Sequence, residues 1–314
     1  MREIKFEIEE NLCSILKRKI MKEKITLLLL FFSLAIFAQE KYTTDYEIEY
    51  ELTFSQDSTD LENQKTEKMY LFSGSEYGVF VNELRAEAEE KLEKLKKKLG
   101  SKDIDIKLGV NTGQFADLNK AVFKDFQNNE IKVLQEIGGK DYIYIEPQKI
   151  DWEITEETKE FMGYQVQKAK TNFAGRTYES WFTLEIPIPD GPYIFHGLPG
   201  LIVEIYDIEK HYHFQMKSID KLEESKTWKL PKTKISDKDK IDKIQQKIMK
   251  NALLNSDYSY MMGKTPGVTG SSMISAGEEF VEISDKSGNE ITKEELKRRY
   301  KAELETRNNP IELE

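Results

Sequence analysis

The sequence predicts an α+β protein built on a large, curved, mostly antiparallel sheet, with a few amphipathic helices packed on one face or end. Three observations predict this class: short segments alternate apolar and polar residues, turn-forming residues separate them, and three longer segments repeat their apolar residues with a helical period. The alternation is clearest over residues 46–54, where aromatic and aliphatic side chains alternate with glutamates. A series of such strands joined by short turns favours antiparallel pairing.

The strands are expected in eleven segments. They cover residues 46–54, 69–72, 77–81, 121–126, 130–137, 141–146, 150–154, 163–169, 180–188, 201–206 and 211–219. The run Ser73-Gly74-Ser75-Glu76 is typical of a hairpin turn between the second and third of these. Because so many segments alternate apolar and polar residues, we expect one face of the sheet to be exposed to solvent or to line a binding site.

Three helices are predicted, over residues 82–99, 237–254 and 293–306. Gly100 ends the first, Ser236 begins the second, and Thr292 with Glu295 forms a capping-box pattern at the start of the third. Their apolar stripes are narrow, so each helix is expected to cover an open face or end of the sheet; the alternative is a helix that acts as a lid on an apolar concavity. Residues 263–277, rich in Gly, Ser, Thr and Met, are predicted to form a mobile loop.

The most informative motif is the run Gly197-Leu198-Pro199-Gly200-Leu201-Ile202. Proline fixes φ for the second position of a turn and glycine tolerates the positive φ that follows, so a type II turn is predicted over residues 198–201. The strand over residues 201–206 should start from this turn. A second reversal is predicted at Pro189-Asp190-Gly191-Pro192.

This stretch resembles the GLPGLI family of secreted proteins, which is common in Bacteroidetes. The similar pieces are, in order, Asp151-Trp152, Gly163-Tyr164, Lys168-Ala169, Gly175-Arg176, Ser180-Trp181-Phe182-Thr183, Glu185-Ile186-Pro187, Gly191-Pro192, the six-residue run and the C-terminal Asn309-Pro310-Ile311-Glu312-Leu313. Val166 stands where many members have a cysteine. The resemblance implies an exported protein of the cell envelope and no established reaction.

The N-terminus predicts export. Residues 21–38 have a basic start, an apolar run and a small residue at the cleavage point, which is typical of a signal peptide, and residues 1–20 are interpreted as a spurious N-terminal extension. A single domain is expected over residues 39–314, periplasmic or extracellular, with no transmembrane anchor once the signal is cleaved. No cysteine follows the apolar run, so a lipoprotein anchor is not expected.

Composition excludes several classes of function. Cys13 is the only cysteine and precedes the cleavage point, so the mature chain is expected to have no disulfide and no thiol nucleophile. Loss of residues 1–38 removes seven basic and five acidic residues, which shifts the formal net charge from −10 to −12. Nucleic-acid binding needs a basic surface and is therefore not expected.

Few residues are candidates for a functional site. His196, His211 and His213 are the only histidines, and three imidazoles suit zinc or copper. The alternative is that they are ordinary loop and strand residues. Arg176 lies at a turn, where it would brace a carboxylate such as Glu179 or Glu185 or bind an anion.

Trp181 is expected either to fill the core or to line a binding groove. A serine-hydrolase elbow and a phosphate-binding loop are both missing from the sequence. The sequence therefore favours a non-catalytic exported binding protein, with an apolar small molecule or an envelope protein bound near Gly197, Leu198, Pro199, Gly200, Leu201 and Ile202 in the concave face of the sheet. The architecture is similar to the half-barrel of periplasmic lipoprotein carriers of the LolA and LolB type. A metal-binding protein and a hydrolase remain alternatives.

Overall fold

The computed structural model describes residues 41–99, 120–137, 140–147, 149–255, 261, 268–275, 278–285, 287–306 and 311. The chain divides into two compact units, one of residues 1–41 with 229–232 and the other of residues 42–228 with 233–314. Of the first unit, only Lys41 and residues 229–232 are described. The predicted extension 1–20, the signal peptide 21–38 and Cys13 lie outside the described residues.

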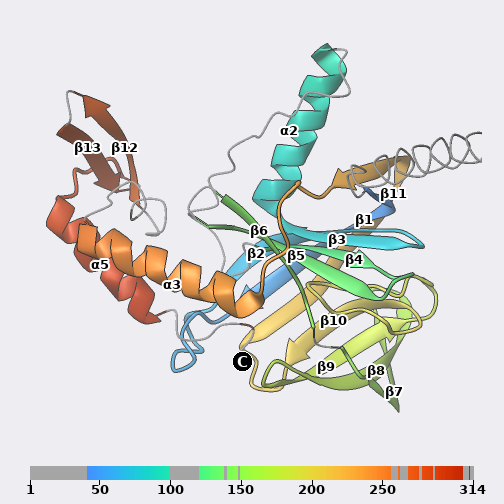
Figure 1. The fold of residues 1–314 in the computed structure, drawn as a ribbon. Helices are drawn as coiled ribbons and strands as arrows, with labels where there is room; N and C mark the ends of the chain where they lie inside the picture. The colour runs from blue at the N-terminus through green and yellow to red at the C-terminus, as the bar shows by residue number, and fades with distance from the viewer. Residues whose placement is uncertain are drawn as a thin grey trace, which may run out of the picture. The chain divides into compact units, whose positions relative to one another are not determined.

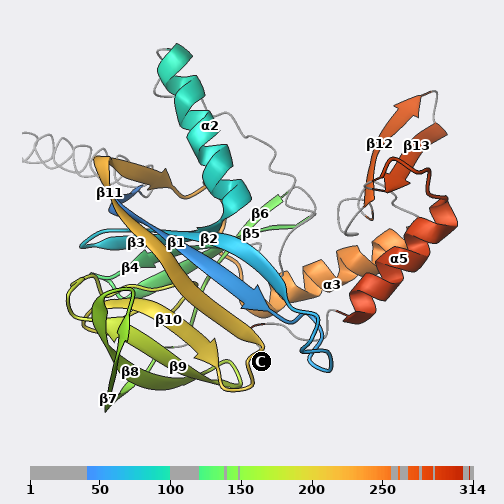
Figure 2. The same cartoon turned by 180° about the vertical axis from the view of Figure 1, so that it is seen from behind.

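The main sheet has eleven strands in the order β6-β5-β4-β3-β2-β1-β11-β10-β9-β8-β7 (Figure 1). The strands are β1 (Lys41–Phe54), β2 (Lys65–Ser73), β3 (Tyr77–Asn82), β4 (Lys120–Asp125), β5 (Glu130–Ile137), β6 (Lys140–Ile145), β7 (Glu153–Phe161), β8 (Tyr164–Phe173), β9 (Arg176–Thr183), β10 (Leu201–Asp207) and β11 (Tyr212–Lys229). Strands β1 to β6 form one meander, β7 to β11 form another, and the two join where β1 lies beside β11 (Figure 2).

The junction of the two meanders is antiparallel. The Ser55 amide, just after β1, donates to the His211 carbonyl (2.9 Å), just before β11. The Thr44 hydroxyl, near the start of β1, donates to the Lys226 carbonyl (3.3 Å), near the end of β11. The outermost strands, β6 and β7, do not pair with each other, so the sheet is open. The predicted α+β class with a large antiparallel sheet is confirmed, whereas the likeness to lipoprotein carriers stays a prediction.

All three predicted helices form, as α2 (Glu83–Leu99), α3 (Lys238–Asn255) and α5 (Lys293–Thr306). Helix α2 contacts β2 and β3, and α3 contacts β6. The Thr292 hydroxyl accepts a hydrogen bond from the Glu295 amide (3.1 Å), as the capping pattern predicts. The cap of α3 is Asp237 rather than Ser236, because the Asp237 carboxylate accepts from the Lys240 amide (3.3 Å) while the Ser236 amide donates to the Ile143 carbonyl.

A small hairpin of β12 (Val268–Ser275) and β13 (Glu278–Asp285) replaces most of the predicted mobile loop over residues 263–277. That prediction is wrong for residues 268–275, because their in-register pairing with β13 outweighs their weak strand propensity. A second, smaller core lies here. It is formed by Ala252, Met261, Val268, Ile283, Ile291, Leu296 and Tyr300.

Strand boundaries differ from the prediction at β11, which continues past the predicted end at Ile219 to Lys229, and around β7 to β9. The predicted strand 150–154 is instead β7, which starts at Glu153 and continues to Phe161 because it pairs with β8 across a turn at Met162 and Gly163, both at positive φ. The predicted strand 180–188 is β9, which ends at Thr183, before the proline-rich segment that cannot supply a regular ladder of amide donors.

Residues 184–200, which we call the inner loop, connect β9 to β10 and pack into the main core. Tyr193, Ile194, Phe195 and Leu198 are all essentially buried within it. The Phe195 ring lies 4.7 Å from that of Tyr178 on β9. This face of β7 to β11 is therefore filled by protein, and its apolar surface is used for folding.

Candidate functional site

The run 197–202 ends the inner loop, but it does not form the predicted type II turn. The Leu201 amide donates to the Ile186 carbonyl (3.0 Å), and the Gly197 amide donates to the Pro189 carbonyl (3.0 Å). Positive φ occurs at Gly197 (+91°), while Gly200 does not have it. Glycine is required at 200 for a different reason, since a Cβ there would lie 1.9 Å from the Thr183 carbonyl oxygen.

The apolar side chains of this run belong to the core. Leu198, Leu201 and Ile202 are buried, and only Gly197 and Pro199 are exposed. Leu201 and Ile202 also start β10, where they pair with β9. Because these side chains already have protein neighbours, they present no apolar surface to a ligand in this conformation.

A different surface carries the chemically active groups. Side chains alternate along a strand, so Glu179 and Trp181 lie on the face of β9 opposite to Tyr178 and the inner loop. The strand register places Lys168 and Glu204 beside Trp181, and it places Tyr206 beside Glu179. We call this surface the Trp181 face. Its members are Glu157, Lys159, Lys168, Lys170, Glu179, Trp181, Glu204, Tyr206 and His213.

Lys159 lies at the centre of one half of this face. Its Nζ is 4.3 Å from the centroid of the Trp181 ring, a cation–π distance, and it also pairs with the Glu204 carboxylate. The other Glu204 oxygen accepts a hydrogen bond from Nε2 of His213 (2.9 Å). Burial alone would raise the pKa of Glu204, but the hydrogen bonds from His213 and Lys159 outweigh it and hold that pKa below its ordinary value.

Glu179 lies at the centre of the other half of the Trp181 face and binds its neighbours there. Its carboxylate pairs with Lys168 (3.0 Å) and Lys170 (3.4 Å), and it accepts from the Tyr206 hydroxyl (3.0 Å). Burial raises the pKa of Glu179, but the bonds from Lys168, Tyr206 and Lys170 lower it further than burial raises it. Lys168 also pairs with Glu157 (3.3 Å), and its hydrogen bond to Glu179 is the main cause of its raised pKa.

The Trp181 face is balanced in charge, since three lysines and three glutamates lie close together. Such a surface attracts neither anions nor cations as a class, because each charge already has an opposite neighbour. It instead offers closely spaced donors and acceptors above the Trp181 ring. Of the two roles expected for Trp181, the structure shows the first, because the residue is 8% exposed and belongs to the main core. A neutral ligand with many hydroxyl groups, each able to donate and accept, matches this pattern.

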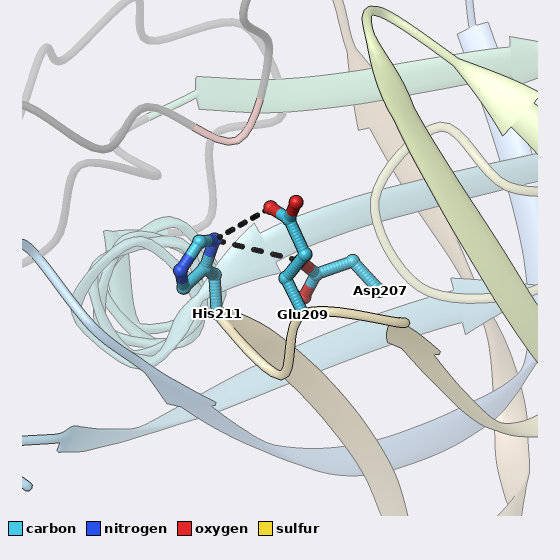
Figure 3. A group of neighbouring side chains, drawn as sticks. All are labelled: Asp207, Glu209 and His211. Atoms are coloured by element: carbon cyan, nitrogen blue, oxygen red, sulfur yellow. Dashed lines mark ion pairs between the residues drawn. The ribbon is translucent and has the colours of Figure 1, made fainter. Parts of the chain in front are cut away.

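Arg176 braces a carboxylate, as expected, but not the predicted one. Its Nη1 donates to Asp207 (3.2 Å), whereas Glu179 binds the lysines above and Glu185 accepts from the Gln165 amide. The prediction of Glu179 or Glu185 is wrong because Arg176 starts β9 beside Asp207, at the end of β10, on the buried face. Asp207 lies beside Glu209 and His211 in the turn before β11 (Figure 3).

The three histidines do not share one cluster of metal-binding atoms in the described part of the chain. His211 lies in the turn with Asp207, and His213 bonds Glu204 on the Trp181 face. His196 donates from Nδ1 to the Ile194 carbonyl (3.0 Å), and burial, followed by the charge of Lys124, lowers its pKa. The three imidazole rings therefore do not converge on one metal-binding position among the described residues.

Comparison with known proteins identifies one family model. A model described as "N-glycanase peptide, N-terminal domain" matches residues 102–247. This range contains β4 to β11 and the whole Trp181 face. The resemblance to the GLPGLI family rests on the sequence motifs given above and stays a prediction. No curated protein matches the chain.

Two crystal structures of PNGF-II, in the C2 and P21 space groups, are also similar. Each has 16% sequence identity to this chain and covers 74% of it, with TM-scores of 0.43 and 0.42. The chain spans about a third of the length of that protein, since 35% of PNGF-II is covered. A likeness this low supports no argument about function. Among the described residues, no helix is long and apolar enough to cross a membrane.

Proposed function

We propose that this chain is an exported, non-catalytic binding domain that recognises the carbohydrate of glycoproteins through the Trp181 face. The observation that carries the proposal is the position of Lys159, 4.3 Å over the Trp181 ring and paired with Glu204. The Lys159 side chain, 38% exposed, offers a donor, and the carboxylates beside it offer acceptors, within the reach of one sugar ring. The Trp181 ring beneath it is only 8% exposed and supports Lys159 from the core side.

The charge balance and the family match support a sugar over other ligands. Sugar hydroxyls both donate and accept, so one ring can bond a lysine and a glutamate at once. The description of the matched family model names an N-glycanase, which points to N-linked glycans as the carbohydrate to test. An apolar ligand near residues 197–202 is less well supported, because Leu198, Leu201 and Ile202 pack in the core.

Binding is tested by isothermal titration calorimetry with an N-glycosylated peptide and with the same peptide after its glycan is removed. The glycosylated form should bind and the bare form should not. Lys159→Met retains the stem over Trp181 and loses the charged donor, so it should weaken binding by about tenfold or more. Lys91→Met is a matched control, since Lys91 is an exposed lysine paired with Glu87 on α2.

The non-catalytic part of the proposal has its own readout. After long incubation with the protein, the glycosylated peptide should keep its mass in mass spectrometry. Release of the glycan would identify an enzyme instead and would contradict this part alone. Equal affinity for both peptides, or unchanged affinity in Lys159→Met, would contradict recognition of the carbohydrate.

Export is tested separately. The full chain should be processed in a secreting bacterial host, with Gln39 as the first residue found by N-terminal sequencing. A retained N-terminus in the cytoplasm would contradict this part of the proposal.

A further inference from the structure

The turn between β10 and β11 brings together three side-chain atoms of the kinds that bind metals. They are Oδ2 of Asp207, Oε2 of Glu209 and Nδ1 of His211, and ligand atoms of the three residues lie within 4.8 Å of one another (Figure 3). The turn is tight: the Lys210 amide donates to the Asp207 carbonyl (2.9 Å), and Lys210 has a positive φ of 61°. Residues 207, 209 and 211 thus point toward one centre.

The two distances from His211 are close to those around a tetrahedral metal ion. Nδ1 of His211 is 3.4 Å from Glu209 and 3.7 Å from Asp207. Bonds of about 2.1 Å at tetrahedral angles place two ligand atoms roughly 3.4 Å apart. A hydrogen bond fixes the orientation of the Asp207 carboxylate, because its other oxygen accepts from the Tyr212 amide (2.6 Å).

Arg176 supplies the positive charge at this centre. Its Nη1 lies 2.8 Å from His211 Nδ1, 3.2 Å from Asp207 and 3.9 Å from Glu209. A guanidinium only donates, so the ring nitrogen of His211 must accept and its lone pair must point at Arg176. This is the lone pair that a metal ion would use, and an ion bonded to all three ligands would come too close to Nη1 for both to remain.

We propose that Asp207, Glu209 and His211 form a binding site for a divalent transition-metal ion of the zinc type, and that the Arg176 guanidinium occupies it as a built-in competitor. Two carboxylates and one imidazole suit such an ion, with the fourth position left to water. The ion binds the wild-type protein weakly because it must displace Arg176. The site differs from the three-histidine site that the sequence suggests and is independent of the proposed carbohydrate binding.

The approach to the site is on the Glu209 side. The Arg176 and Asp207 side chains are 2% and 1% exposed, but the Glu209 side chain is 63% exposed. An ion therefore meets Glu209 first and reaches the buried ligands from there. Removal of the Glu209 carboxylate should slow or weaken binding, whereas removal of His211 should abolish it.

The test is a titration with Zn²⁺ by calorimetry and with Co²⁺ by visible absorption, which reports tetrahedral coordination. Arg176→Gln should bind one ion at least tenfold more tightly than the wild type. Adding His211→Ala to this variant should abolish binding. Lys210→Gln is the matched control, because it removes one positive charge from the same turn and leaves Arg176 in place; it should bind like the wild type.

Two results would overturn the site: Arg176→Gln that binds no more tightly than Lys210→Gln, or binding that persists after His211→Ala. Circular dichroism checks that each variant is folded. If Arg176→Gln does not fold, Arg176→Lys carries the same test, since a shorter and more flexible cation leaves the centre more easily and should still bind Zn²⁺ more tightly than the wild type.

Discussion

The Lys124 ammonium and the Asp190 carboxylate form an ion pair whose two side chains are almost completely buried. Lys124 lies on β4 and also donates to the Gly191 carbonyl (2.6 Å). Asp190 lies in the inner loop and accepts from the Ser73 hydroxyl on β2 (2.6 Å). The pair therefore fixes the inner loop against the first meander, and the loop in turn supports the buried side of the strands that carry the Trp181 face.

Removing one member of this pair should destabilise the fold strongly. Asp190→Ala and Lys124→Met each leave a buried group without its partner, so each should lower the free energy of unfolding by about 3–5 kcal/mol. Urea denaturation measures this loss. In the double variant the loss should be clearly smaller than the sum of the two single losses; additive losses would show that the two groups do not interact.

Gly200 should be the less replaceable of the two glycines in the 197–202 run. A Cβ at 200 would meet the Thr183 backbone, whereas a Cβ at 197 meets nothing within 4 Å and only the positive φ opposes it. Gly197→Ala should therefore lose about 1–2 kcal/mol of stability, and Gly200→Ala should lose more. Thermal unfolding of the two variants gives the order, and the reverse order would contradict this account of the run.

Acid should weaken the fold partly through Glu204. Its pKa in the folded protein lies below the ordinary 4.5, so its ionised form stabilises the fold above that pH. This stabilisation is lost as the pH falls from about 4.5 through the lower folded value. Urea unfolding of Glu204→Gln at pH 6 and pH 3 should show a smaller drop in stability than the wild type.

The exposed residue Glu87 on α2 supplies the control for this pH effect. Glu87→Gln should show the same acid dependence as the wild type. If Glu204→Gln loses as much stability between pH 6 and pH 3 as the wild type does, Glu204 contributes nothing to the acid response.

The strands and helices could be predicted from the sequence because their signals are local. Alternation over residues 46–54 and the capping pattern at Thr292 each lie within a few neighbouring residues, and both form as expected. The type II turn at Gly200 failed for the opposite reason. Glycine is needed at position 200 because a Cβ there would clash with the carbonyl of Thr183, which belongs to a different strand.

The candidate site was only partly predictable. The sequence points to Trp181 and Arg176 but not to Lys159 and Glu204, because no sequence signal marks one lysine or glutamate among many. Their positions depend on the register of β7 to β10, which contains irregular pairing between Ile154 and Thr158 and between Ile202 and Glu204. Alternation along each strand, once the register is known, is the signal that identifies this face.

The most direct test of carbohydrate recognition at the Trp181 face is a two-dimensional ¹H–¹⁵N NMR titration of the mature protein with the N-glycosylated peptide. The chain has three tryptophans, so its spectrum has three indole N–H signals, from Trp152, Trp181 and Trp228. The Trp181 signal should shift on addition of the glycosylated peptide, the other two should stay in place, and the bare peptide should shift none. An unchanged Trp181 signal at saturating glycopeptide would contradict the proposed function.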